Sequence, residues 1–305
     1  LKNGVKVVVL PTQHKKDQVL YTLSLDGGKT LISTEDMPSF EDNIWSLYLS
    51  NTGVSKFSGT QLSKMLAGKH VSVTPYLSNI RHGLNGQCAP KDLETAMQLM
   101  YLFFTAPRFD ADEYATSMQQ IKAVLPNLKN NPQFKFQRAV NETLYANSPR
   151  VVNLDETVLE KASLETLKKV YTEQLFKDAA GATLTIVGNV DLETLKPLVE
   201  KYIGSLPKGK KPAGVNTDNL ISMAKGEVKN DVKIAMQTPK TTVFQVHSAY
   251  MPIDTKTEVT LEAANYVLDM IYTKTIREQE GGTYGVGSSL AATREPYSRI
   301  TFMVQ

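Results

Sequence analysis

The sequence predicts an α+β fold in which two consecutive domains repeat one order of strands and helices. Three observations support this prediction. Short stretches with alternating polar and apolar residues, typical of half-buried strands, come in pairs along the chain. Stretches with apolar residues at steps of three and four, typical of helices, separate these pairs. A run of proline, glycine and lysine, Leu206–Gly214, divides the two series of elements.

The first domain begins with two predicted strands. Val5–Leu10 is rich in β-branched residues and is closed by Pro11, and the apolar residues of Val19–Leu25 alternate with polar or small ones. Two helices are expected next. Apolar residues take helical spacing over Phe40–Tyr48, and Thr60–Ala67 is a second, short helix.

A second pair of strands, Val71–Pro75 and Ile80–Gly86, is predicted to form a hairpin. The next helix opens at Pro90 and Asp92, because proline suits the first helical turn and an acid suits the positive end of a helix. Pro107 is expected to stop this helix.

The rest of the first domain is largely helical. Asp110 to about Leu128 is predicted to form a helix that Pro126 kinks or ends. Phe134–Tyr145 forms another, and Ser163 caps the start of a third. Ala182–Val187 is a continuous apolar run and is expected to be a central strand. A further helix follows it, through Tyr202.

Beyond Leu206–Gly214 the order of elements starts again. The predicted elements are strands at Val232–Met236 and Thr242–Tyr250, a helix at Glu258–Arg277, and strands from Thr283 and at Ile300–Val304. This repeats the order of the first domain, although the residues themselves do not repeat. We therefore predict a complete domain at 1–207, a linker at 208–224, and a second domain at 225–305 that lacks its last elements.

Composition and charge exclude several classes of protein. The net charge of +3 is too small to indicate nucleic-acid binding, and the longest basic run is Lys208–Lys211. The single cysteine, Cys88, excludes an internal disulfide framework. No apolar run is long enough for a membrane span. Because the chain opens on Leu1 and shows no signal-peptide pattern, we expect a fragment of a longer precursor.

Few residues have a pattern that indicates a catalytic or metal site. None of the histidines, His14, His70, His82 and His247, has another within four residues, so the pair of histidines on one helix that zinc peptidases use is missing. His70 and His82 flank the predicted hairpin and could approach each other, although ordinary polar positions on a sheet explain them equally well. Cys88 is expected to be a packing residue.

The most informative stretch runs from Ile276 to Gly287. The helix before it should end at Gly281-Gly282, which places Arg277 in the last helical turn and Tyr284 at the start of the next strand. A guanidinium and a phenol are donors suited to a peptide carbonyl or a developing oxyanion. A simpler alternative stays open, because cations favour helix C-termini and the glycines could serve only the turn.

Three stretches resemble the insulinase/pitrilysin family of inverted zinc metallopeptidases. They are the opening Leu1–Val7, the stretch Ala182–Pro207 with its strand, Gly-Asn-Val-Asp turn, helix and Gly-Ser-Leu-Pro ending, and the corner from Arg277 to Gly287. The resemblance implies repeated α/β-roll domains, as in processing peptidases, each a mostly antiparallel sheet with helices packed on one face. Two halves of two such domains would enclose a peptide-binding chamber.

The zinc site of the family is missing from the matching positions. The family carries His-x-x-Glu-His on the first helix of its first half, whereas the matching helix Phe40–Ser50 contains no histidine. The later helix has glutamines after Met118 where the family has a glutamate ligand. The resemblance therefore implies the non-catalytic C-terminal half, with no catalytic residue and no metal of its own. Zinc would belong to an N-terminal half.

In this interpretation Arg277 and Tyr284 bind peptide substrate opposite the zinc site. The expected partners are a zinc-bearing N-terminal half, in the same polypeptide or a separate subunit, and a peptide; neither nucleic acid nor a membrane span is expected. A bacterial periplasm or envelope is the expected compartment. The alternative hypothesis is a degenerate peptidase-like subunit that only scaffolds an assembly. Two donors at the edge of the chamber favour the first hypothesis.

Overall fold

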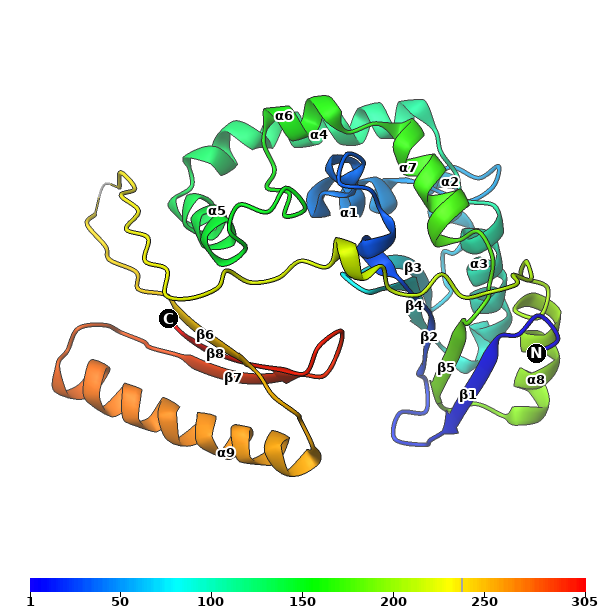
Figure 1. Cartoon of the computed structure of the whole chain (residues 1–305). Helices are drawn as coiled ribbons and strands as arrows, with labels where there is room; N and C mark the ends of the chain where they lie inside the picture. The colour runs from blue at the N-terminus through cyan, green and yellow to red at the C-terminus, as the bar shows by residue number, and fades with distance from the viewer. Residues whose placement is uncertain (237) are drawn as a thin grey trace. The chain divides into compact units, whose positions relative to one another are not determined.

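The chain divides into two compact units, which the computed structural model describes over residues 1–236 and 238–305 (Figure 1). Unit 1 comprises Leu1–Ile234 and is built on a five-stranded sheet. Unit 2 comprises Ala235–Gln305 and is built on a three-stranded sheet. Each unit therefore has a sheet of its own.

The unit 1 sheet has the strand order β1-β5-β2-β4-β3. Only the β1–β5 pair is parallel; the other pairs are antiparallel, as predicted for a mostly antiparallel sheet. The apolar strand expected to be central, β5, lies between β1 and β2. The strands are β1 (Lys6–Pro11), β2 (Val19–Asp26), β3 (Val71–Leu77), β4 (Arg81–Cys88) and β5 (Thr183–Gly188).

Helices cover one face of this sheet. The α-helices of unit 1 are α1 (Asp42–Asn51), α2 (Gly59–Met65), α3 (Leu93–Thr105), α4 (Ala111–Asn130), α5 (Pro132–Leu144), α6 (Glu156–Lys161), α7 (Leu164–Val170) and α8 (Leu192–Tyr202). Helix α3 packs on β3 and β4 and against α8 (Figure 1). Alternate strand residues such as Leu23 and Ile186 point into this layer and are fully buried there with Met97. The predicted one-sided arrangement is confirmed.

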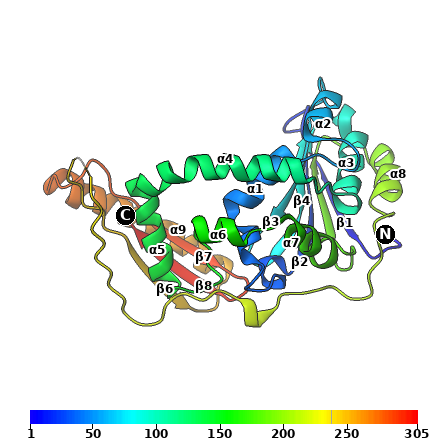
Figure 2. The ribbon, with the colours of Figure 1, turned by 90° about the horizontal axis from the view of Figure 1, so that it is seen from above.

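A smaller apolar cluster holds α1 against α4, which runs beside it (Figure 2). Ile44 of α1 is buried with Ile121 and Leu125 of α4. The helix predicted to run to about Leu128 is observed as α4, which continues to Asn130, so Pro126 does not end it. Proline removes the hydrogen bond to the carbonyl of Lys122, and Lys122 is exposed, so water can solvate that carbonyl.

Short turns and side-chain caps fix the ends of several helices. The Ser163 hydroxyl accepts the Thr166 N–H at 3.0 Å, which confirms the predicted cap of α7. Helix α7 continues into a π-helical turn, η4 (Tyr171–Leu175). The 3₁₀ turns of unit 1 are η1 (Gly28–Leu31), η2 (Met37–Phe40), η3 (Pro90–Asp92) and η5 (Thr217–Asn219).

The last segment of unit 1, residues 208–234, has little regular structure but is hydrogen-bonded to the rest of the unit. The Asn216 amide donates to the Thr30 hydroxyl at 3.0 Å, and the Asn219 side chain donates to the Thr30 carbonyl at 2.8 Å. Further along, the Ala224 amide donates to the Leu144 carbonyl at 2.7 Å. These bonds attach the segment to η1 and to the end of α5. The domain limits predicted from the sequence, 1–207, 208–224 and 225–305, remain a prediction about folding units.

Unit 2 repeats the topology of three of the five strands of the unit 1 sheet. Its elements are β6 (Gln245–Tyr250), α9 (Thr255–Tyr272), the π-helical turn η6 (Thr273–Gln279), β7 (Ser288–Thr293) and β8 (Arg299–Val304). The strand order is β6-β8-β7 with both pairs antiparallel, which matches β2-β4-β3 in unit 1. In both units helical elements connect the first strand to the second. The predicted repeat is confirmed for these three strands.

The strand predicted at Val232–Met236 is wrong, because these residues have no regular structure. Its counterpart in unit 1 is β1, and β1 pairs only with β5. The described part of unit 2 contains no strand in the position of β5. Without that partner, the backbone groups of Val232–Met236 have no ladder to join.

Helix α9 has apolar side chains on two faces. Val259, Tyr266 and Met270 share one face by their helical spacing in the sequence, and these side chains are at least half exposed. The helix instead turns a second apolar face, with Leu261 and Leu268, toward β7. Both faces of α9 are apolar, so spacing alone could not decide which one meets the sheet.

Candidate functional site

The corner between α9 and β7 holds both residues predicted to bind substrate. Helix α9 begins at Asp254, whose carboxylate accepts the Thr257 N–H at 2.7 Å. The helix then widens into η6, which carries Arg277 in its last turn as predicted. Single π-helical turns of this kind are frequent at functional sites. Gly281 ends the helix with φ 61°, a conformation that glycine adopts without strain.

Tyr284 lies in the loop before β7, so its predicted place at the start of that strand is wrong. The loop residues 280–285 are exposed apart from Thr283, and the Tyr284 side chain is fully exposed. Locally the Thr283 hydroxyl donates to the Gly285 carbonyl at 2.8 Å. The four glycines at 281, 282, 285 and 287 explain why the strand starts later, since glycine weakens strands.

Hydrogen bonds anchor both ends of this loop. At the helical end, the Gly282 amide donates to the Ile276 carbonyl at 3.1 Å. At the strand end, the Ser288 amide and hydroxyl each donate to Asp269 Oδ1 at 2.7 Å. The bonds from Ser288 hold the pKa of the Asp269 carboxyl below its ordinary value. The loop is therefore exposed along most of its length, and hydrogen bonds hold both of its ends.

Neither predicted substrate residue has a fixed partner within the described part of the chain. No hydrogen bond or ion pair of Arg277 or Tyr284 occurs there, although Glu278 and Glu280 are close in sequence and exposed. Both side chains thus present free donors to the solvent. Such donors can bind a carbonyl oxygen or a carboxylate.

The positions that match a zinc site in related peptidases do not fit zinc here. Helix α1 lacks histidine, and the preceding Glu41 uses its carboxylate as a cap that accepts the N–H groups of Asn43 at 2.9 Å and Ile44 at 3.2 Å. His70 and His82, which the sequence allowed to approach each other, lie at opposite ends of the β3–β4 hairpin. Among the described residues no group of three acids, histidines or cysteines is placed to hold a metal.

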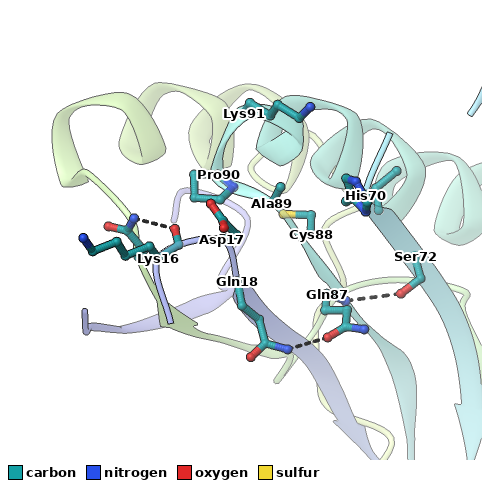
Figure 3. A pocket seen from close by; sticks show the side chains of 12 residues that line it. Lys16, Asp17, Gln18, His70, Ser72, Gln87, Cys88, Ala89, Pro90 and Lys91 are labelled. Carbon is teal, nitrogen blue, oxygen red and sulfur yellow. Dashed lines mark hydrogen bonds between the residues drawn. The ribbon is translucent and has the colours of Figure 1, made fainter. Parts of the chain in front are cut away.

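A polar pocket of about 960 Å³ lies at one end of the unit 1 sheet, where β2 and β3 begin and β4 ends (Figure 3). The Gln18 amide donates to Gln87 Oε1 at 2.6 Å across its floor. Cys88 borders the pocket but is buried, and burial raises the pKa of its thiol to about 12, which leaves it unreactive as a nucleophile. The other residues around the pocket include Lys16, Asp17, His70, Ser72 and Lys91.

This pocket was not predicted from the sequence. Its residues come from four separate segments, and most of them are ordinary polar residues at or beside the end of a strand. A signal did exist, because Lys16, His70 and Lys91 all lie at ends of predicted strands or beside them. Only the strand order brings those ends together.

Within the residues that the structure describes, no helix combines the length and the apolar character that crossing a bilayer requires.

Comparison with known proteins agrees with the resemblance in the sequence. Residues 161–304 match the family model of the peptidase M16 inactive domain. The chain is 24% identical over 296 residues to a probable zinc protease, PqqL, of Escherichia coli K12, covering 95% of the chain and 31% of that protein. It is 29% identical over 225 residues to a zinc protease PQQL-like protein of Arabidopsis thaliana, covering 72% of the chain and 20% of that protein.

Solved structures share the fold. The crystal structure of the periplasmic protease PqqL of Escherichia coli superposes with a TM-score of 0.79 at 22% identity, over 99% of this chain and 33% of that one. This chain therefore spans no more than about a third of the length of these relatives. Residues 161–304 thus match the peptidase M16 inactive domain, and the chain as a whole is similar to part of longer proteins described as zinc proteases.

Proposed function

We propose that this chain forms the non-catalytic wall of the chamber of a zinc peptidase and binds peptide at the Arg277–Tyr284 corner. One observation carries the proposal. Two donors without partners in the described chain lie at one exposed corner, Arg277 in the last turn of η6 and Tyr284 in a loop whose two ends are held by hydrogen bonds. A loop that only connected a helix to a strand would need neither side chain.

The chemistry of the corner suits a peptide backbone. The Tyr284 hydroxyl can donate one hydrogen bond to a carbonyl oxygen, and the Arg277 guanidinium can donate two in parallel. Both donors become more effective when negative charge grows on that oxygen during hydrolysis. Because both ends of the loop are already held, the loop loses less conformational entropy when a peptide binds, and this favours affinity.

The remaining components would come from elsewhere. A zinc-bearing N-terminal half, in the same polypeptide or in a partner subunit, would supply the metal and the general base. This is supported by relatives three times as long that are described as zinc proteases. A periplasmic location is supported by the PqqL structure, which is described as a periplasmic protease.

Steady-state kinetics of the full-length enzyme on a peptide substrate test this proposal. Tyr284→Phe removes only the hydroxyl, and we expect turnover to fall on the order of 10²-fold if that group donates in the transition state. Arg277→Lys keeps the charge but loses the planar fork, so we expect impaired turnover there too. The matched control is Tyr297→Phe, at a half-exposed tyrosine elsewhere in unit 2.

The competing hypothesis is a scaffold with no role in catalysis. It predicts that both variants keep the turnover and the Michaelis constant of the wild type and differ from it only in thermal stability. Wild-type kinetics in two folded variants would therefore reject the peptide-binding role of this corner.

A further inference from the structure

The face of the unit 1 sheet that points away from α3 and α8 carries a cluster of exposed aliphatic side chains. Strand register places Leu10, Val187 and Leu20 side by side on β1, β5 and β2. Leu10 is 58% exposed and Leu20 is 46% exposed. Val8, on the same face two residues before Leu10, is 41% exposed. These four residues, called the aliphatic cluster below, form a continuous patch across three neighbouring strands.

The aliphatic cluster continues directly into the polar pocket. On its other side Leu20 is paired with Gln87 of β4, and Gln87 is paired with Ser72 of β3. Both Gln87 and Ser72 line the pocket, and Gln18 joins them from the start of β2 (Figure 3). An apolar surface and a polar depression therefore share one row of the sheet.

The rim of the pocket is basic. Lys16 and Lys91 both line it, and neither belongs to any ion pair found among the described residues. Asp17 is the one carboxylate in the lining, and the imidazole of His70 adds a ring N–H that can donate a hydrogen bond. The rim therefore favours a ligand that carries carboxylates.

The neighbouring row of the sheet offers hydrogen bonds. It begins beside Val8 of the aliphatic cluster and consists of Thr185, Thr22, Asn85 and Thr74, in register from β5 to β3. Hydroxyl and amide side chains of this kind can both donate to and accept from a peptide backbone. An extended peptide would thus find apolar, polar and cationic contacts on one flat surface.

We propose that this face binds an extended peptide segment in which an apolar side chain lies roughly two to four residues from a carboxylate. The spacing is short because Gln87 of the pocket lining is paired directly with Leu20, one strand spacing of about 4.8 Å away. A second copy of the chain fits less well, because it would bring Lys16 and Lys91 against the same charges. The proposal rests on the peptide-binding role proposed above and adds a determinant of peptide choice on unit 1.

Fluorescence anisotropy with labelled peptides tests it on the full-length protein, with a chelator present to prevent hydrolysis. The probe is an extended peptide with one phenylalanine followed three residues later by two glutamates. One matched peptide replaces the phenylalanine by serine, and another replaces the glutamates by lysines. We expect each change to weaken binding by roughly tenfold or more. Equal binding of all three peptides would overturn the proposal.

Variants locate the site. Leu10→Thr combined with Leu20→Thr keeps β-branched or strand-compatible residues on the surface and should weaken binding of the probe by about tenfold. The matched control is Leu192→Thr, an exposed leucine at the start of α8 on the covered side of the sheet. Lys16→Glu with Lys91→Glu should weaken binding further and remove its salt dependence, whereas Lys122→Glu on α4 should not.

The result separates this proposal from the role of the corner. If the aliphatic and lysine variants bind the probe like the wild type while Tyr284→Phe still lowers turnover, the sheet face is not the site and the corner keeps its role. If the sheet variants lose affinity while Tyr284→Phe changes turnover alone, both proposals hold.

Discussion

Tyr21 packs its ring directly over Gly86 across the β2–β4 pair. The two residues are opposite each other in register, and a Cβ at position 86 would lie 2.9 Å from Cε2 of Tyr21. The same Cβ would lie only 1.8 Å from the Ser72 carbonyl oxygen. The Tyr21 hydroxyl reaches past the glycine and donates to that oxygen at 2.7 Å. Because Gly86 has no side chain, Tyr21 of β2 can pass over β4 and bond to Ser72 of β3, so one side chain contacts three strands.

Gly86→Ala is therefore expected to destabilise unit 1 by about 3 kcal/mol or more, because the obstructing Ser72 oxygen belongs to the backbone and cannot rotate away. Tyr21→Phe should cost about 1 to 2 kcal/mol through the lost hydrogen bond. Urea unfolding followed by circular dichroism measures both changes. Asn85→Ala, an exposed change on the same strand, is the control. Stability of Gly86→Ala equal to that of this control would contradict the packing described.

The pH dependence of stability should report the buried histidine His82. The Gly28 amide donates to its Nδ1 at 3.3 Å, so Nε2 carries the proton and donates to the Leu175 carbonyl at 2.6 Å. Burial lowers the pKa of this imidazole from 6.5 to about 4, although the Leu175 carbonyl and Asp26 act in the opposite direction. Protonation would leave the Gly28 amide facing a second donor.

Between pH 6.5 and about 4 the unfolded chain binds a proton at His82 that the folded chain does not bind. Stability should therefore fall as the pH is lowered through this window, by about 3 kcal/mol in total from this one group. His82→Gln has no titrating ring, so its stability should depend less on pH in the same window. Parallel pH profiles for the wild type and the variant would show that His82 does not contribute.

Much of the fold follows from local sequence. The cap at Ser163, the alternation in Val19–Leu25 and the apolar run Ala182–Val187 each correctly predict an element, because capping and strand periodicity act within a few residues. Val232–Met236 has an equally good strand pattern and is not a strand. The difference lies in a partner strand far away in the sequence, which a local pattern does not report.

The candidate site was predictable in part for the same reason. Gly281 marks the end of the helix, so Arg277 was placed correctly in the last turn. Tyr284 was predicted at the start of a strand, but the strand begins only at Ser288. There the Ser288 amide donates a hydrogen bond to the side chain of Asp269 on α9. That contact joins residues nineteen positions apart, and spacing gave no sign of it. The pocket and the aliphatic cluster depend on strand order and were not found.

Arg150 should contribute to stability through the hydrogen bonds that its planar guanidinium makes, more than through its charge. Its side chain is buried, and no carboxylate pairs with it among the described residues. Its guanidinium donates to the Lys29 carbonyl at 2.8 Å and to the Thr34 hydroxyl at 3.1 Å. Burial without a counter-ion lowers the pKa of this group.

We expect Arg150→Met to cost about 1 to 3 kcal/mol, because the Lys29 carbonyl still accepts the Ile32 amide at 3.2 Å after the arginine is removed. Arg150→Lys should cost at least as much, since a compact ammonium is harder to desolvate and cannot span both acceptors. Urea midpoints at neutral pH compare the two. A lysine variant clearly more stable than the methionine variant would show that the charge itself is required.

The last prediction concerns the attachment of the substrate corner. Asp269 Oδ1 accepts both the amide and the hydroxyl of Ser288, and these are the bonds that fix the start of β7 next to α9. Asp269→Ala removes both, so the Ser288 amide should exchange its hydrogen faster and residues 280–287 should become more mobile. Asp269→Asn keeps an oxygen at the same position and should preserve most of the protection. Ser289→Ala, on the adjacent exposed position, is the control.

Hydrogen exchange and kinetics together show whether this anchor serves the corner. If Arg277 and Tyr284 bind peptide, a looser loop must be ordered on binding, and Asp269→Ala should raise the Michaelis constant while Asp269→Asn stays near the wild type. Because the hydrogen bonds from Ser288 lower the pKa of Asp269, the folded carboxylate stays charged to lower pH than its ordinary value of 3.8. The hydrogen bonds from Ser288 to Asp269 should thus persist at pH 5 and weaken only as the pH falls below the ordinary carboxyl pKa of 3.8. Fast Ser288 exchange already at neutral pH in the wild type would mean that the loop has no fixed end.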